Sequence, residues 1–168
     1  LLQTLQQQEA SGDFEGAAET HMGLQENDGY SAEARSHRLL SGLGFAPGDA
    51  ARRVSEFSGG WRIRLNLARA LMTPSDVLLL DEPTNHLDMD ASLWLQRWLQ
   101  EYPGTLLLIS HDRDFIDATC GRVLHIERQQ LNSYRGGYTD FEQLRALRLA
   151  EQQAQHEKQQ RRIAEIED

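Results

Sequence analysis

Two adjacent acids, Asp81 and Glu82, follow directly on an unbroken apolar run at residues 77–80. A run of this length is typical of a strand buried on both faces of a parallel sheet. Such a strand would deliver both carboxylates to the carboxyl edge of the sheet, where α/β proteins bind ligands. Side by side, the two carboxylates repel each other unless a cation compensates them, as in a Mg²⁺–phosphate centre. For the dipeptide alone, an exposed Asp-Glu-Pro turn is the stronger interpretation.

A second polar segment, Ser58-Gly59-Gly60, stands immediately before a helix that we expect to begin at Arg62. Two glycines allow the backbone to approach a ligand closely, and free amides at a helix N-terminus attract anions. Ser58 adds a hydroxyl donor. The tripeptide also describes any tight turn before a helix, so by itself it is a weak indication of a binding site.

The third segment contains a histidine, His111, which follows a second apolar run at residues 105–109. If both runs are neighbouring parallel strands, His111 emerges at the same sheet edge as Glu82. A lone histidine is usually a packed or surface residue, but one at this place could reach a phosphate bound beside the two acids.

Other elements can be read from periodicity and from turn residues. The two apolar runs alternate with an amphipathic helix at 62–72 and a helix at 90–101, and a short helix follows at 112–119. In the helix at 90–101 we expect four side chains to face inward: Leu93, Trp94, Trp98 and Leu99. This alternation indicates an α/β domain with a mostly parallel sheet. The remaining expected elements are helices at 1–9, 13–25 and 31–42, a turn at 27–29, a strand pair at 123–126 and 131–134, and a long helix at 138–168.

The composition excludes several classes of protein. The net charge is −9, and residues 1–34 contain seven acids but no lysine or arginine, so the chain lacks the basic character of most nucleic-acid binders. It contains no signal-peptide pattern and no apolar run long enough to span a membrane. The single cysteine, Cys120, excludes an internal disulfide. We therefore expect a cytoplasmic protein.

In this order and spacing, the three segments resemble the ATP-binding cassette (ABC) ATPases, P-loop proteins that sandwich ATP and Mg²⁺ between two cassettes. The resemblance implies that Ser58, Gly59 and Gly60 form the signature loop, which meets the γ-phosphate of ATP held by the partner cassette. It implies that Asp81 binds magnesium, that Glu82 is the catalytic base and that His111 is the switch histidine. Asp88 would end the D-loop, which begins at Asn85 and crosses the dimer interface.

Further residues are similar to the ABC-F family, and most of all to its bacterial YheS-type branch. Trp61 stands where most transporters carry glutamine, the D-loop reads Asn-His-Leu-Asp, and Tyr134-Arg135-Gly136-Gly137-Tyr138 resembles the turn that ends the first cassette of that family. ABC-F proteins are two tandem cassettes with no membrane domain, and many act on ribosomes. The resemblance, clear from about residue 39, implies a second cassette as partner and contact with the ribosome and tRNA.

The chain does not contain the phosphate-binding loop of such an ATPase. That loop needs Gly-x-x-x-x-Gly-Lys-Ser/Thr, and the only lysine, Lys158, lies in a Gln-rich segment without glycine. We therefore interpret the sequence as a partial ABC ATPase domain, truncated before residue 1 and inactive alone. The expected division is a helical subdomain or arm region at 1–53, an ATPase core without Walker A at 54–137, and a linker helix at 138–168.

Three functional classes remain open. The first is a ribosome-associated ATPase of the ABC-F kind, which binds and hydrolyses ATP in the intact protein. The second is the ATP-binding subunit of a membrane transporter, against which Trp61 and the terminal helix count. The third is a DNA-repair ATPase of the coiled-coil type, whose longer heptad arms are not visible here.

Overall fold

A computed structural model describes the backbone of residues 1–26 and 29–167, and the side chains of this part up to residue 162. The expected turn at 27–29 therefore lies mostly outside the described residues. The chain divides into two compact units. The first contains Leu1–Ser75 and His86–Leu95, and the second contains Asp76–Asn85 and Gln96–Asp168.

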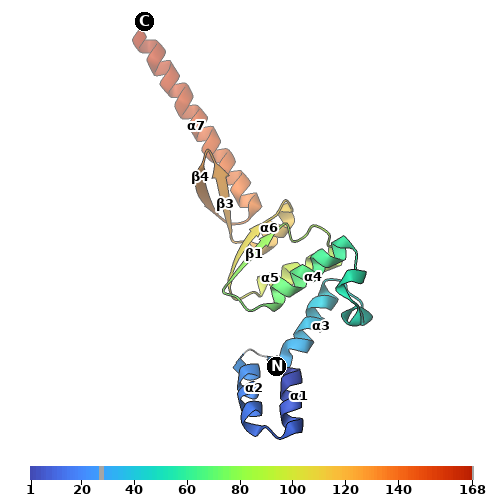
Figure 1. The fold of residues 1–168 in the computed structure, drawn as a ribbon. Coiled ribbons are helices and arrows are strands. Elements are labelled where there is room, and N and C mark those ends of the chain that lie inside the picture. The colour runs from blue at the N-terminus through green and yellow to red at the C-terminus, as the bar shows by residue number, and fades with distance from the viewer. Residues whose placement is uncertain (27–28, 168) are drawn as a thin grey trace. The chain divides into compact units, whose positions relative to one another are not determined.

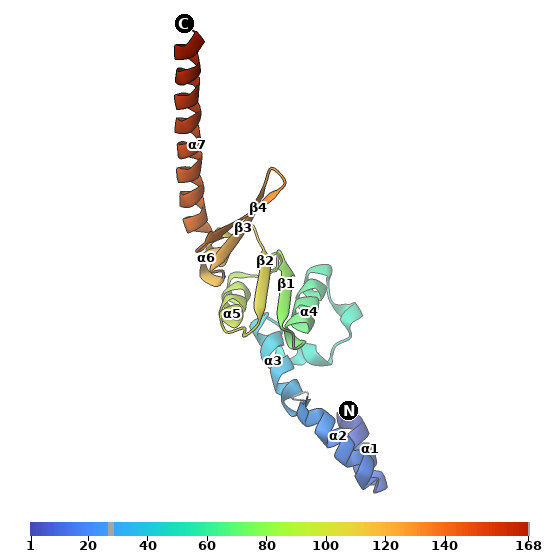
Figure 2. The same cartoon turned by 90° about the vertical axis from the view of Figure 1, so that its left-hand side faces the viewer.

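The first unit opens with two antiparallel helices, α1 (Leu2–Ser11) and α2 (Phe14–Glu26), which lie side by side in both ribbon views (Figures 1 and 2). The Asp13 carboxylate accepts a hydrogen bond from the amide of Gly16 at 3.0 Å, so it caps α2 as its residue type predicts. Leu5, Ala17 and Leu24 bury a small apolar cluster between the helices.

The main core of the first unit lies between α3 (Ala32–Gly42) and α4 (Gly59–Met72). Leu43, Phe45, Phe57 and Ala68 are its buried residues, and the rings of Phe45 and Phe57 meet edge to face at 5.7 Å. Helix α4 begins three residues earlier than predicted, because both glycines take helical positions. Three 3₁₀ helices connect or precede these elements: η1 (Gly29–Ser31), η2 (Pro47–Ala51) and η3 (Val54–Glu56).

The second unit is built on two strand pairs. Strands β1 (Val77–Asp81) and β2 (Thr105–Ile109) are parallel, with Asp81 opposite Ile109. Strands β3 (Arg122–Glu127) and β4 (Gln130–Arg135) form an antiparallel hairpin. The described residues thus hold the parallel pair that the two apolar runs predicted, and the strand pair expected at 123–126 and 131–134 is antiparallel.

Helices complete the second unit. Helix α6 (Arg113–Thr119) follows β2, and α7 (Tyr138–Glu167) follows β4 and runs beside the β3–β4 hairpin (Figure 2). Every described side chain from Ala146 onward is exposed. Helix α5 (Met89–Gln100) begins in the first unit and ends in the second.

Two expectations about burial were wrong. Strands β1 and β2 bury one face only, since Leu78 and Leu80 are buried whereas Leu79 is 68% exposed, and Leu107 and Ile109 are exposed as well. An unbroken apolar run predicts cover on both faces, but the described residues cover one. In α5 the buried residues are Ala91, Leu95 and Leu99, and Leu93, predicted to face inward, is exposed.

Among the described residues, no helix is both long and apolar enough to cross a membrane. The division at 1–53, 54–137 and 138–168 stays a prediction, because the compact units follow different boundaries.

Candidate functional site

The two strand ends bring an acid and a histidine together. Glu82 directly follows β1, and its amide donates to the carbonyl of Ile109 at 2.8 Å, which ties the end of β1 to the end of β2. The Glu82 carboxylate accepts a hydrogen bond from the His111 amide, and its Oε1 atom lies 3.3 Å from His111 Nε2. This is the shared sheet edge that the two apolar runs predicted.

Exposure differs sharply within this pair. The Glu82 side chain is 20% exposed, whereas the His111 side chain is 96% exposed. The carboxylate is thus held in a fixed place by its neighbours, while the imidazole can reach a molecule bound outside the strand ends. The largely covered Glu82 carboxylate suits proton transfer, and the exposed His111 imidazole suits hydrogen bonding to an anionic substrate.

The backbone at Glu82 takes an uncommon conformation. Its φ is +47°, in the left-handed region that costs an ordinary residue about 1–2 kcal/mol. The Glu82 carbonyl accepts from the amide of Asn85 at 3.2 Å, which closes a turn immediately after the strand. This turn directs the Glu82 side chain toward the end of β2, and backbone strain of this kind is concentrated at functional sites.

Asp81 is the candidate magnesium ligand. It is the last residue of β1 and is exposed, so its carboxylate is open to solvent. Within the described residues, no group of three or more His, Cys, Asp or Glu side chains could hold a metal ion. Mg²⁺ commonly takes only one or two protein carboxylates and completes its shell with phosphate oxygens and water. The Asp81 carboxylate therefore fits a Mg²⁺ ion that is also bound by phosphate oxygens and water.

The Ser-Gly-Gly turn lies in the first unit, at the beginning of α4. Ser58 is the N-cap with an extended backbone, and it makes no side-chain capping bond. The first hydrogen bond of the helix runs from the amide of Arg62 to the carbonyl of Ser58, so the preceding amides of the first turn have no partner within the helix. A Cβ atom added to Gly59 or Gly60 would meet nothing within 4 Å. The start of α4 thus presents open amides, which suit an anion.

Asp88 lies in the first unit as well, where it caps α5. Its carboxylate accepts from the Ala91 amide at 2.9 Å and from Arg64 Nη1 at 3.0 Å. The Ala91 amide, and then Arg64, hold the pKa of the Asp88 carboxyl below its usual value. Asp88 therefore stays ionised and fixes the beginning of α5.

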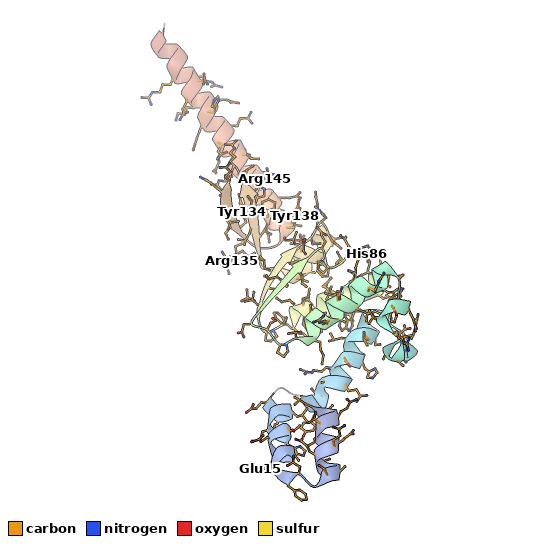
Figure 3. The ribbon with its side chains drawn as sticks, viewed as in Figure 1. Glu15, His86, Tyr134, Arg135, Tyr138 and Arg145 are labelled. Atoms are coloured by element: carbon orange, nitrogen blue, oxygen red, sulfur yellow. The ribbon has the colours of Figure 1, made fainter. Side chains whose placement is uncertain are left out.

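Sequence reasoning missed Arg64, whose contacts hold this region together. Its Nε atom donates to the His86 carbonyl at 2.7 Å, its Nη1 atom donates to the Leu43 carbonyl at 3.1 Å, and its guanidinium stacks on Trp61 at 4.7 Å. The one signal in the sequence was its position on the otherwise apolar face of α4. Figure 3 labels His86, whose φ is +75°.

The predicted site residues thus fall into two sets. Asp81, Glu82 and His111 belong to the second unit, where the structure brings Glu82 and His111 into contact. The other four belong to the first unit: Ser58, Gly59, Gly60 and Asp88.

Comparison with known proteins identifies the family of the chain. A family model described as "ABC transporter" matches residues 2–85, and a second model with the same description matches residues 124–168. The chain belongs to the ATP-binding cassette family. A solved structure of a bacterial ABC transporter cassette in dimeric form has the same fold over 61% of this chain and 46% of its own, with a TM-score of 0.51 and 21% identity.

Curated relatives narrow the class to the ABC-F type. "Probable ATP-binding protein YheS" of Haemophilus influenzae is 50% identical over 167 residues, which cover 99% of this chain and 26% of the relative. The Escherichia coli protein of the same name is 54% identical over 92% of this chain and 24% of its own length. Human "ATP-binding cassette sub-family F member 3" is 46% identical over 90% of this chain and 22% of its own length.

These matches correct the expected extent of the resemblance. The similarity to the Haemophilus influenzae relative takes in nearly the whole chain, whereas the sequence motifs alone reached back only to about residue 39. The acidic helices α1 and α2 therefore belong to the matched region. The chain spans about a quarter of the length of these curated relatives.

Proposed function

We propose that the intact protein hydrolyses ATP and that this chain supplies the catalytic acid pair and the histidine of one half-site together with the signature turn of another. The observation that carries the proposal is the contact between Glu82 and His111 at adjoining strand ends, directly after Asp81. The family to which the chain belongs supports the reaction class.

Each side chain has a separate role in this proposal. The Glu82 carboxylate, held by the end of β2, accepts a proton from the water that attacks the terminal phosphate of ATP. The exposed His111 ring donates a hydrogen bond to an oxygen of that phosphate. Asp81 holds Mg²⁺, which when bound neutralises charge on the phosphate oxygens.

The signature turn acts on a different nucleotide. The open amides at Gly59 and Gly60 and the Ser58 hydroxyl bind the γ-phosphate of ATP held by a second cassette. Asp88 keeps the beginning of α5 fixed, so the D-loop that precedes it presents a constant backbone to that cassette. A second ATP-binding cassette is therefore the proposed partner.

The test is Glu82→Gln in the full-length protein. The amide cannot accept the proton, so we expect kcat for ATP hydrolysis to fall by about 10²–10⁴-fold while ATP-dependent closure of the cassettes persists. Steady-state phosphate release and nucleotide-dependent closure would be measured together. Glu101→Gln, which changes an exposed acid after α5, is the matched control and should leave turnover unchanged. Unchanged turnover in Glu82→Gln would remove Glu82 from the base role.

We propose further that the intact protein is a ribosome-associated translation factor of the cytoplasm. The resemblance to the ABC-F family, many of whose members act on ribosomes, supports this. So does α7, the proposed linker helix at 138–168, which follows the proposed ATPase core at 54–137. In the ABC-F family that helix reaches toward tRNA. The segment at 1–53 is the proposed helical subdomain or arm region.

A sedimentation experiment separates this role from that of a transporter subunit. The full-length Glu82→Gln protein, incubated with ATP, should co-sediment with ribosomes and leave them when ATP is replaced by ADP. Recovery in the membrane fraction with a permease would instead favour the transporter alternative.

A further inference from the structure

The β3–β4 hairpin and the first turns of α7 enclose a small pocket within the second unit. Its volume is about 110 Å³, room for roughly three or four water molecules. Figure 3 labels two of its lining residues, Tyr134 of β4 and Arg145 of α7. The polar and charged residues that line it and carry the argument are Glu127, Arg128, Asn132, Tyr134, Arg145 and Arg148.

The pocket is positive in a chain that is strongly negative. Three guanidinium groups line it against a single carboxylate, that of Glu127, so its net charge is +2 where the whole chain has −9. Arg145 Nη2 donates to Glu127 at 3.0 Å and holds the pKa of that carboxyl below its usual value. Glu127 is therefore fully ionised. Its negative charge offsets one of the three guanidinium charges, which leaves the net charge of +2.

The arginine donors are only partly used by the protein. An arginine side chain offers five N–H donors. Arg145 uses Nη2 for Glu127, and its Nε atom is buried and closed to solvent. Arg148 makes two long contacts through Nη1 alone, at 3.3 Å to Asn132 and 3.4 Å to Tyr134. The remaining Arg148 donors are therefore available to an acceptor in the pocket.

The third arginine is held by an unusual turn. Arg128 and Gln129 join the two strands with φ values of +51° and +63°, the pattern of a two-residue hairpin turn that normally uses Asn and Gly. The Arg128 side chain makes no hydrogen bond to the part of the chain that the structure describes, yet it lines the pocket. A residue that strains the turn and bonds to nothing is available for a ligand.

We propose that this hairpin–helix pocket binds a phosphate group, as free inorganic phosphate or as one phosphate of a nucleic-acid backbone. Planar guanidinium groups match phosphate oxygens bidentately, and a tetrahedral anion fits the volume and the +2 charge. Arg128 and Arg148 hold the anion from the hairpin and from α7, and Arg145 adds positive charge beside it. None of these residues belongs to the proposed ATPase site. Binding of free phosphate is therefore independent of the proposed function, whereas binding of a nucleic-acid backbone rests on the proposed ribosomal role, since Arg145 and Arg148 lie on α7.

The test uses the 168-residue chain and three charge-matched variants. Arg128→Gln and Arg148→Gln each remove one guanidinium group from the pocket, and Arg161→Gln removes an exposed arginine farther along α7. Inorganic phosphate is titrated by NMR, and a short fluorescent RNA duplex by anisotropy, with phosphate as competitor. Circular dichroism checks that each variant keeps its fold.

We expect each pocket variant to weaken binding about tenfold and the Arg161→Gln control to leave it unchanged. If the ligand is a backbone phosphate, the RNA duplex binds, phosphate displaces it, and each pocket variant lowers the salt slope by about one. If it is free phosphate, only the anion binds. Equal losses in all three variants, no binding of either probe, or equally tight binding of polyglutamate would overturn the proposal.

Discussion

Arg64 connects three backbone segments that are distant in sequence. It donates to carbonyls at Leu43 and His86 and to the Asp88 carboxylate, and only 12% of its side chain is exposed. Gly44, with φ +90°, lies so close that a Cβ there would be 3.0 Å from Arg64 Nη1. The D-loop residues after Asn85 thus depend on one guanidinium group for their position.

Replacing Arg64 by methionine should therefore destabilise the first unit. The substitution keeps an apolar stem but leaves two carbonyls and a carboxylate without their donor, so we expect a loss of about 2–3 kcal/mol. Urea unfolding followed by circular dichroism would measure it. Arg62→Met, an exposed neighbour on α4, is the control and should change stability by less than about 0.5 kcal/mol.

Arg64→Lys tests whether the planar guanidinium, which donates in several directions at once, is needed in addition to the positive charge. One ammonium group cannot donate to both carbonyls and the carboxylate at once, so Arg64→Lys should recover only part of the loss. Full recovery would show that charge alone holds the region.

Residue types predicted that Glu82 and His111 lie at one edge of the sheet. They did not predict the contacts of Arg64. Two apolar runs followed by polar residues were enough to place both side chains at one edge, because parallel strands end together. The role of Arg64 could not be predicted, since its three acceptors are 21 to 24 residues away and two of them are backbone atoms.

At the scale of elements, the helix that follows the histidine is tied to the long helix α7. The Asp117 carboxylate accepts from both the amide and the hydroxyl of Thr139, at 2.9 and 2.5 Å. Arg113 pairs with Glu142 at 3.1 Å and stacks on Tyr138 at 4.8 Å. Helix α6, whose cap Asp112 is next to His111, is thereby attached to the first turns of α7.

This attachment predicts a pH dependence of stability in the second unit. The hydroxyl and then the amide of Thr139 hold the pKa of Asp117 below its usual value. Because the folded-state pKa is lowered, the stabilisation is fully present above the unfolded pKa of about 3.9 and is lost as pH falls through the folded value.

Asp117→Asn removes that titration. We expect the variant to be less stable than wild type at pH 7 and the difference to shrink as the pH is lowered below 4. Urea midpoints at several pH values, followed by tryptophan fluorescence and circular dichroism, would measure it. Asp114→Asn on the same helix, for which no contact to α7 is seen among the described residues, should show no such convergence. A constant difference across this range would contradict the role of Asp117.

The positions of helices and strands were largely predictable from the sequence. Which face of each helix or strand is buried was not. The sequence located α2, α6 and the two strands of the β3–β4 hairpin closely, and Asp13 and Asp112 cap their helices locally. The exposed face of β1 and β2 and the outward Leu93 could not be predicted, because apolar content does not reveal which neighbours are present to cover it.

For the whole molecule, the question is which nucleotide contacts the chain can make alone. In the proposed function, Asp81, Glu82 and His111 act on the terminal phosphate and its metal, but the sequence contains no Gly-x-x-x-x-Gly-Lys segment to hold the other phosphates. The backbone amides and lysine of that loop supply much of the binding of ATP in P-loop proteins. The acid pair alone repels an anionic nucleotide.

We therefore expect the 168-residue chain to bind Mg-ATP far more weakly than micromolar in isothermal titration calorimetry. Any weak residual binding should be lost in Arg128→Gln, since the hairpin–helix pocket accepts phosphate, and should persist in Glu82→Gln. For the intact protein we expect micromolar affinity, because the proposed ATPase needs a phosphate-binding loop beside Glu82 and His111. Micromolar binding by the chain itself would mean that these strand ends and the signature turn hold ATP without that loop.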